Sequence, residues 1–322
     1  MNRPTEVSKM EEQDAGHILQ ELMAKIPELQ GASAIEPIHK GYSTDLKFKI
    51  RLSGEKSYLL RSYEWSEQPV KQKEYRIIAE LHRRGVRCPQ AISLGQLNEQ
   101  QGYMLLSFIE GEDAEEVLPR MDEQKQWSIG IEAGEQLQRM HELQIEEPAE
   151  SWYVRKSMKH QRYVDKYHHC PIRMRNDQAI LTFIEENMKC MKNRPDRFQH
   201  DDFHPGNLIV KDDRFAGVID FNRYDQGDPV HEFLKLGLFA SETSMPYSIG
   251  QIQGYFNGGD PDELFWRRYS LYMAMALVSS VVWIQQVKPE ETEDMMAKIE
   301  RVQEDHDDFR RLIPRWYNVK NY

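Results

Sequence analysis

The chain has 322 residues and a formal net charge of −11, with 42 Lys and Arg against 53 Asp and Glu. Such an excess of carboxylates argues against a nucleic-acid partner, because nucleic-acid binding depends on neutralising phosphates with Lys and Arg. The cysteines Cys88, Cys170 and Cys190 are scattered, which fits a reducing compartment without a structural disulfide. The N-terminus lacks the apolar core of a signal peptide, and the longest apolar run, 269–284, is shorter than the roughly 20 residues that span a bilayer. We therefore expect a cytoplasmic protein with no membrane partner.

The first part of the chain, 1–110, predicts a small lobe built mainly of strands. Apolar residues at helical spacing predict an N-terminal helix at about 10–28. Short apolar segments separated by turn residues then predict an antiparallel sheet, with one main helix within it. The expected strands are 34–39, 45–52, 56–63, 91–97 and 103–108, and the expected main helix is 69–84.

The remainder, 111–322, predicts a larger and mostly helical lobe. Helices are expected at 122–143, twice within 152–192, and from 228 to about 312. Strand character is found only near 208–210 and 215–219. A five-strand lobe with one helix, followed by a helical lobe, is an α+β layout typical of the two-lobed protein-kinase-like fold. Its boundary is expected near Glu110 and Gly111.

The most informative segment is 200–210, which reads His-Asp-Asp-Phe-His-Pro-Gly-Asn-Leu-Ile-Val and is followed by Asp220. Its frame, H-x-D-x-x-x-x-N with a second Asp after two apolar strands, supplies the groups that phosphoryl transfer needs. Asp202 is the predicted catalytic base, since an attacking hydroxyl must be aligned and must lose its proton. Asn207 and Asp220 are predicted to hold Mg²⁺, which prefers hard oxygen ligands. These residues predict a kinase that phosphorylates a small-molecule hydroxyl with ATP or GTP.

The same segments resemble the aminoglycoside phosphotransferase family, whose members are small-molecule kinases with a protein-kinase-like fold. The segment 134–141 is similar to that family's G-x-x-L-x-x-L-H helix, and 220–229 is similar to its D-F-x-x-x-x-x-G-D-P stretch. The resemblance covers about residues 34–245. It implies a nucleotide-binding lobe at 1–110 and a catalytic and substrate-binding lobe at 111–322.

The resemblance also implies nucleotide contacts made by loops and backbone groups of the first lobe. The loop Lys-Gly-Tyr-Ser-Thr at 40–44 is similar to the family's nucleotide loop, where Gly41 permits a tight turn and Ser43 binds a phosphate. A simple hairpin turn is the alternative for this loop. The segment 106–111 resembles the hinge, in which backbone groups of Ser107 and Ile109 contact adenine.

One departure from the family concerns Arg61, which stands where most kinases place a phosphate-binding Lys. Arg keeps the charge but has a different hydrogen-bonding geometry. Glu74, in the following helix, is its implied partner. Because charge near the phosphates supplies most of the stabilisation, we expect Arg61→Lys to be tolerated.

A second departure is Asp201, which stands where the family usually has Gly. It either attracts a cationic acceptor or caps a local turn, and the turn is favoured. His200 is expected to brace the loop through a backbone hydrogen bond. The resemblance implies an acceptor site formed by a helical insert at about 150–195 and by the C-terminal helices. Four acids are candidates for holding a cationic acceptor there: Asp225, Glu232, Asp260 and Glu263.

Several functional hypotheses remain open. The acceptor is an aminoglycoside-type antibiotic, or the chain is a metabolic kinase of the choline, homoserine, fructosamine or methylthioribose type. A nucleotide-binding pseudoenzyme is less favoured, because Asp202, Asn207 and Asp220 are all intact. A metal-dependent phosphohydrolase built on His200 and Asp201 would need further ligands.

Overall fold

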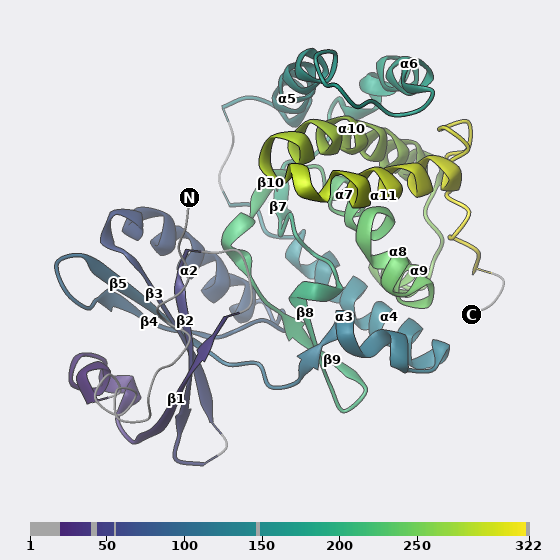
Figure 1. Cartoon of the computed structure of the whole chain (residues 1–322). Coiled ribbons are helices and arrows are strands. Elements are labelled where there is room, and N and C mark those ends of the chain that lie inside the picture. The colour runs from purple at the N-terminus through teal and green to yellow at the C-terminus, as the bar shows by residue number, and fades with distance from the viewer. Residues whose placement is uncertain (1–19, 40–43, 55, 146–148, 320–322) are drawn as a thin grey trace. The chain divides into compact units, whose positions relative to one another are not determined.

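The computed structural model describes residues 20–39, 44–54, 56–145 and 149–319. The chain divides into two compact units, Met1–Glu110 and Gly111–Tyr322 (Figure 1). Of the helix expected at 10–28, residues 20–25 are helical, and the preceding ones lie outside the described part. The assignment of nucleotide binding to one unit and catalysis to the other stays a prediction.

The N-terminal unit is a five-stranded antiparallel sheet with the strand order β1-β2-β3-β5-β4 and one long helix, α2 (Figure 1). Its core includes Ile26, Leu29, Ile50, Leu60 and Leu105, all with at most 1% of their surface exposed. The predicted strands and helix are present, with their ends within two residues of those expected. Their bounds are β1 (Ala32–Ile38), β2 (Leu46–Leu52), β3 (Ser57–Glu64), β4 (Ala91–Gln96), β5 (Gln101–Ser107), α2 (Gln68–Arg83), η1 (Pro27–Leu29) and η2 (Trp65–Glu67).

The C-terminal unit is mostly helical, as predicted. The helices expected at 122–143 and within 152–192 form as α4, α5 and α6. Its α-helices are α3 (Ala114–Val117), α4 (Glu123–Met140), α5 (Trp152–Tyr167), α6 (Asp177–Asn187), α7 (Pro229–Glu232), α8 (Ser241–Thr243), α9 (Met245–Tyr255), α10 (Glu263–Val287) and α11 (Thr292–Asp305). A π-helical segment, η7 (Leu236–Ala240), precedes α8. Short 3₁₀ segments are η3 (Leu118–Arg120), η4 (Met188–Met191), η5 (Pro205–Asn207), η6 (Phe221–Arg223) and η8 (Pro289–Glu291).

Short strands in this unit frame the segment that contains Asp202. The predicted hairpin forms as β8 (Leu208–Lys211) and β9 (Arg214–Val218), and β6 (Glu112–Asp113) adds to it. The sequence did not predict β6, nor the antiparallel pair β7 (Arg197–Gln199) and β10 (Asp225–Gly227). Two or three residues are too few to display an alternating pattern.

The apolar run 269–284 belongs to the long helix α10. By length and composition alone α10 could cross a bilayer, but 67% of its most apolar window is buried within the structure. Tyr269, Leu271, Val278 and Val281 along it have no exposed surface. A core helix of a globular unit has this character, which agrees with the buried helix that the sequence predicted.

Helices α4 and α9 are in unusually close contact, because each carries two glycines where the other approaches. A Cβ atom on Gly130 or Gly134 of α4 would lie 2.2 or 2.1 Å from a backbone oxygen of α9. A Cβ atom on Gly250 or Gly254 of α9 would likewise lie 2.2 or 2.1 Å from a backbone oxygen of α4. The glycine at the start of the G-x-x-L-x-x-L-H segment therefore serves this helix contact.

We predict that Gly130→Ala destabilises the protein, although Ala is a better helix former than Gly by about 1 kcal/mol. The added methyl group meets the Tyr247 carbonyl oxygen, and relieving that overlap costs on the order of 1–3 kcal/mol. Urea unfolding gives the comparison. Glu135→Ala, at an exposed position of the same helix, is the matched control and should change the unfolding free energy little. Equal or greater stability of Gly130→Ala would contradict this account of the α4–α9 contact.

Candidate active site

Asp202 and Asn207 meet within the loop that joins β7 to β8. The Asn207 side-chain nitrogen donates to the Asp202 carboxylate at 3.1 Å and to the Asp202 backbone oxygen at 2.9 Å. The loop turns back on itself over these five residues, as their spacing predicted. The amide therefore fixes the position of the carboxylate and leaves the Asn207 side-chain oxygen without a hydrogen bond among the described residues.

The residue before Asp220 is hydrogen-bonded to both ends of this loop. His200 Nε2 lies 2.9 Å from the Ile219 carbonyl oxygen, and the Ile219 N–H donates to the Asn207 carbonyl at 2.9 Å. His200 is fully buried, and burial lowers its pKa, so its ring is neutral and Nε2 carries the donated proton. His200 thus braces the loop, as expected from the sequence.

Asp220 adopts the left-handed backbone conformation, with a φ of 65°, two residues after β9 ends. This is uncommon for a residue with a side chain, and such strain is concentrated at functional sites. The Asp220 carboxylate makes no hydrogen bond or ion pair within the described part of the chain. This carboxylate and the Asn207 side-chain oxygen are oxygen donors of the kind that fits Mg²⁺, which takes one or two protein ligands together with phosphates and water.

Glu232 has a different role from the one that the sequence suggested. It is 2% exposed, and its carboxylate accepts hydrogen bonds from the backbone N–H groups of Asp201 at 3.1 Å and Phe203 at 3.4 Å. Burial raises its pKa, but His141, His200 and the Asp201 N–H outweigh that effect, so the pKa of Glu232 is lowered. Glu232 therefore holds the backbone of the loop that contains Asp202, and its carboxylate is engaged there.

Asp201 also has the left-handed conformation, with a φ of 60°. This explains why the related family uses Gly here, since Gly adopts positive φ without strain and Asp tolerates it better than most residues. The left-handed backbone of Asp201 therefore supports the prediction that this residue serves a local turn. Burial and the charges of Glu232 and Asp225 raise the pKa of Asp201 to about 6, against the opposing charges of Lys235 and Lys156.

Lys235 is a site residue that the sequence did not reveal. Its ammonium lies 2.9 Å from the Asp202 carboxylate, and His204 Nε2 lies 3.6 Å from the same oxygen. Burial raises the pKa of Asp202, but His204 and Lys235 more than offset this and hold that pKa well below its usual range. Lys235 directly precedes the π-helical segment η7, and such segments are frequent at functional sites. Only the fold brings it to Asp202, since the two residues are 33 positions apart.

Asp228, the Asp of the G-D-P segment, joins several elements in the interior of the C-terminal unit. Asp228 has no exposed surface and accepts hydrogen bonds from Arg194 at 2.9 and 3.0 Å and from the Tyr272 hydroxyl at 2.7 Å. The Tyr272 hydroxyl also accepts from Trp152 Nε1 at 2.8 Å. Asp228 therefore ties the start of α7 to α5 and α10.

Arg61 lies in a buried network within the N-terminal unit. Its guanidinium donates to Glu74 at 2.5 Å and to Asp45 at 2.6 and 2.9 Å, and Lys71 donates to both oxygens of Asp45 at 2.7 Å. The implied contact between Arg61 and Glu74 is present, whereas Asp45 and Lys71 were not singled out from the sequence. A single lysine nitrogen cannot reproduce this fork between two carboxylates. The geometry therefore argues against the expected tolerance of Arg61→Lys.

The other predicted nucleotide contacts are only partly described. Gly41 and Ser43 lie outside the described residues. The Ser107 N–H already donates to the Gln90 carbonyl at 2.9 Å, so it is not available to adenine. The backbone groups of Ile109 have no hydrogen bond among the described residues, as a hinge position requires.

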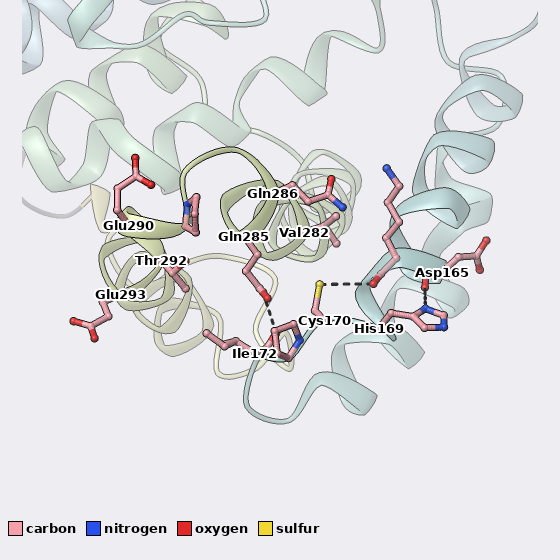
Figure 2. Close-up of a pocket in the computed structure, with 13 residues that line it drawn as sticks. Asp165, His169, Cys170, Ile172, Val282, Gln285, Gln286, Glu290, Thr292 and Glu293 are labelled. Atoms are coloured by element: carbon pink, nitrogen blue, oxygen red, sulfur yellow. Dashed lines mark hydrogen bonds between the residues drawn. The ribbon is translucent and has the colours of Figure 1, made fainter. Parts of the chain in front are cut away.

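A pocket of about 940 Å³ lies elsewhere in the C-terminal unit. It is formed by the end of α5, the loop that follows it, α10 and the start of α11, and includes His169, Cys170, Ile172 and Gln285 (Figure 2). No residue of the 200–207 loop lines it. It is therefore not the pocket in which Asp202 acts.

The phosphohydrolase alternative lacks a set of ligands. Among the described residues, no three His, Cys, Asp or Glu side chains gather where they could hold a metal ion. His141, one of the further histidines that it would need, has its Nδ1 2.9 Å from the Tyr255 hydroxyl. The segment around Asp202 instead holds a positioned carboxylate and two further oxygen donors, Asn207 and Asp220, which are the kinds of group that a kinase requires.

Comparison with known proteins agrees with this geometry. The family model described as the phosphotransferase enzyme family (APH) matches residues 34–268, and the chain therefore belongs to that family. It is accordingly a nucleotide-dependent phosphotransferase that acts on small molecules. A search of curated protein sequences found no match.

Solved structures share the fold at low sequence identity. A GDP complex of an aminoglycoside 2′-phosphotransferase-IIIa mutant superposes with a TM-score of 0.68 at 14% identity, covering 91% of this chain and 98% of the other. The gentamicin complex of APH(2″)-IIa gives 0.60 at 13% identity, covering 92% and 97%. A mutant of APH(4)-Ia with ADP and hygromycin B gives 0.61 at 14% identity, covering 87% and 96%. These likenesses confirm the protein-kinase-like α+β fold.

We predict that Lys235→Met moves the acidic limb of the pH–activity profile to higher pH. Removing the ammonium removes one of the charges that lower the pKa of Asp202, so its carboxylate becomes protonated at a higher pH than in the wild type. Lys298→Met is the matched control, because Lys298 also lies over the Phe239 ring but pairs with Glu242. If both variants keep the wild-type acidic limb, Lys235 does not set the ionisation of Asp202.

Proposed function

We propose that this chain transfers the γ-phosphate of ATP or GTP to a hydroxyl of a small molecule, with Asp202 as the catalytic residue and Asn207 and Asp220 as the Mg²⁺ ligands. The observation that carries the proposal is the double hydrogen bonding of Ile219 to His200 and Asn207. It ties Asp220 to the loop in which Asn207 clamps Asp202.

In the proposed mechanism Asp202 mainly aligns the acceptor. Its low pKa makes it a weak base, which suits a loose transition state in which the hydroxyl proton leaves late. The Lys235 ammonium, 2.9 Å from the same carboxylate, places positive charge beside the position where phosphoryl oxygens must pass. Bound Mg²⁺ would neutralise charge on the nucleotide phosphates.

The nucleotide contacts of the N-terminal unit are also part of the proposal. Arg61 and Glu74 would act near the phosphates, with Asp45 and Lys71 holding the guanidinium in one orientation. The free backbone groups of Ile109 support an adenine contact there. Gly41 and Ser43 are proposed for the phosphates on the grounds of the family resemblance alone.

The chemical class of the acceptor is also part of the proposal. The related structures carry gentamicin and hygromycin B in their titles, which favours an aminoglycoside as the first candidate. Three of the four acids expected to hold such a cation are engaged elsewhere. Glu232 binds the loop backbone, Asp260 accepts from the Tyr317 hydroxyl at 3.0 Å, and Glu263 pairs with Arg267 at 2.6 Å. This observation favours the second candidate, a metabolic small-molecule kinase.

A cytoplasmic location belongs to the proposal as well. Cys88, Cys170 and Cys190 are free thiols, and free thiols are typical of reducing compartments. The proposed partners are the nucleotide and one small-molecule acceptor, without nucleic acid or membrane.

We predict that Asp202→Ala folds normally and loses turnover by about 10²–10⁴-fold, the range for removing a positioned acid–base group. Phosphoryl transfer to a screened acceptor is the assay, with circular dichroism as the test of folding. Asp213→Ala, in the exposed turn between β8 and β9, is the control and should turn over normally. Near-wild-type turnover by folded Asp202→Ala would rule out the assignment.

We predict that Asp220→Gly abolishes the Mg²⁺ dependence of nucleotide binding. Gly accommodates the φ of 65°, so the substitution removes the ligand without adding backbone strain. Calorimetry with ATP, with and without Mg²⁺, makes the comparison, and Asp213→Gly is the matched control. An unchanged response of Asp220→Gly to Mg²⁺ would mean that the cation is held elsewhere.

A further inference from the structure

Helix α5 is strongly basic in an otherwise acidic chain. Its 16 residues include Arg155, Lys156, Lys159, Arg162 and Lys166, against a single acid, Asp165. A row of cations on a surface helix is usually solvated. Here the start of the helix lies against the segment that carries Glu232, so its first cations lie near the catalytic loop.

The beginning of α5 is held firmly in place. Trp152 donates from Nε1 to the Tyr272 hydroxyl, which in turn donates to Asp228. Its ring also occupies the space that a side chain at Gly227 would need, within 2.3 Å of the Cβ position. Since Lys156 follows Trp152 by one helical turn, it lies on the same face of α5. Its position is therefore fixed by the fold.

Lys156 is directed at His231 of α7. Its ammonium nitrogen lies 2.6 Å from His231 Nε2 and also lies over the rings of Trp152 at 5.6 Å and Tyr272 at 6.0 Å. Burial, together with the charge of Lys159, lowers the pKa of Lys156 to about 7. His231 is 9% exposed, and its Nδ1 is buried without a hydrogen-bond partner, 3.9 Å from the Asp201 carboxylate.

Lys156 and Lys159 have no ionic partner within the part of the chain that the structure describes. Across the described ranges, no carboxylate lies within ion-pair distance of Lys156 or Lys159, whereas Arg155, beside them, pairs with Asp196 and donates to the Gln226 carbonyl at 3.2 Å. A partly buried ammonium without a counter-charge is unfavourable. An anion supplied from outside would remove that cost.

These cations lie within electrostatic range of the catalytic loop. The charges of Lys156, Lys159 and Lys235 all act on His231, and the charge of Asp201 acts on Lys156. Lys235 in turn contacts Asp202. A small molecule could therefore bind the start of α5 through an anionic group and place a second group at Asp202.

We propose that the acceptor is a small hydroxyl compound that carries a carboxylate, and that Lys156 and Lys159 bind this carboxylate while the hydroxyl lies at Asp202. The inference rests on the proposed phosphotransferase function and specifies its substrate class. A carboxylate fits better than a phosphate, because Asp201, Asp202 and Asp225 nearby would repel a dianion more strongly.

With this substrate, phosphoryl transfer forms one bond to phosphorus and breaks another. The hydroxyl oxygen forms a bond to the γ-phosphorus, and the bond from that phosphorus to the β–γ bridging oxygen breaks, with its electron pair leaving on the nucleoside diphosphate. The hydroxyl proton passes to Asp202 and from there to solvent. The product is a phosphate monoester that keeps its carboxylate.

The test compares hydroxy acids with their neutral amides. The full chain is assayed with Mg²⁺-ATP for phosphoryl transfer to glycerate, 4-hydroxybutyrate and homoserine, each against the corresponding amide. Binding is measured by calorimetry with a non-hydrolysable ATP analogue. We expect at least one acid to exceed its amide in kcat/KM by about tenfold or more, as a charge-assisted hydrogen bond provides.

Variants then assign the effect to α5. Lys159→Met, at an exposed position, should lower kcat/KM for the acid about tenfold and so remove most of the acid's advantage over its amide. Lys156→Met should have the same effect. Because Lys156 is more buried, this variant is at greater risk of not folding, and Lys159→Met then provides the test. Lys166→Met is the matched control on the same helix, because Lys166 lines the separate pocket of Figure 2.

The outcomes separate the two proposals. The carboxylate acceptor is overturned, and the phosphotransferase kept, if the chain binds Mg²⁺-ATP but no acid in the set binds or reacts better than its amide. Phosphorylation of a polycation such as kanamycin, with kcat/KM rising in Lys159→Met, overturns it in the same way. A folded wild-type chain that binds neither Mg²⁺-ATP nor Mg²⁺-GTP would instead remove the proposed function on which it rests.

Discussion

The candidate active site depends on the backbone N–H and carbonyl groups of Ile219. Its carbonyl accepts from buried His200, and its N–H donates to Asn207. The first bond orients the start of the loop that contains Asp202, and the second orients its end, so the residue before Asp220 is bonded to both ends of this loop. Both bonds are buried or partly buried, and a buried backbone group left without a partner costs about 1–3 kcal/mol. This geometry is therefore strongly favoured over alternatives in which Asp220 lies apart from Asn207.

Buried carboxylates support this assembly from within the C-terminal unit. Glu232 accepts two N–H groups of the loop, and Asp228 joins Arg194, Tyr272 and the first turn of α7. Charges so deeply buried are stable only when they are fully hydrogen-bonded, and losing one partner costs several kcal/mol. Of these two, only Glu232 was among the acids expected from the sequence to hold a cationic acceptor. The burial of Glu232 and its hydrogen bonds to the backbone support the loop that contains Asp202.

The sequence predicted what depends on local pattern and spacing. The strands and helix of the N-terminal unit and the pairing of Asp202 with Asn207 follow from periodicity and from a short loop that must turn back. It missed Lys235, Asp45 and His231, whose contacts join residues far apart in the chain. No local rule indicates that a lysine before a π-helical segment will reach Asp202. Gly41 and Ser43 stay predictions, because they lie outside the described residues.

The net charge of the chain differs in sign from several of the charges that lie near Asp202. The net charge of −11 describes the whole surface, but screening confines each charge to about 8–10 Å at ordinary ionic strength. What an acceptor meets is set by the few groups that lie within that distance of it. Near Asp202 these include Lys235, with Lys156 and His231 beside Asp201, while Glu232 is already satisfied by the backbone. The acceptor's charge must therefore match this local arrangement, in which Lys235 pairs with Asp202 and Lys156 has no ionic partner among the described residues.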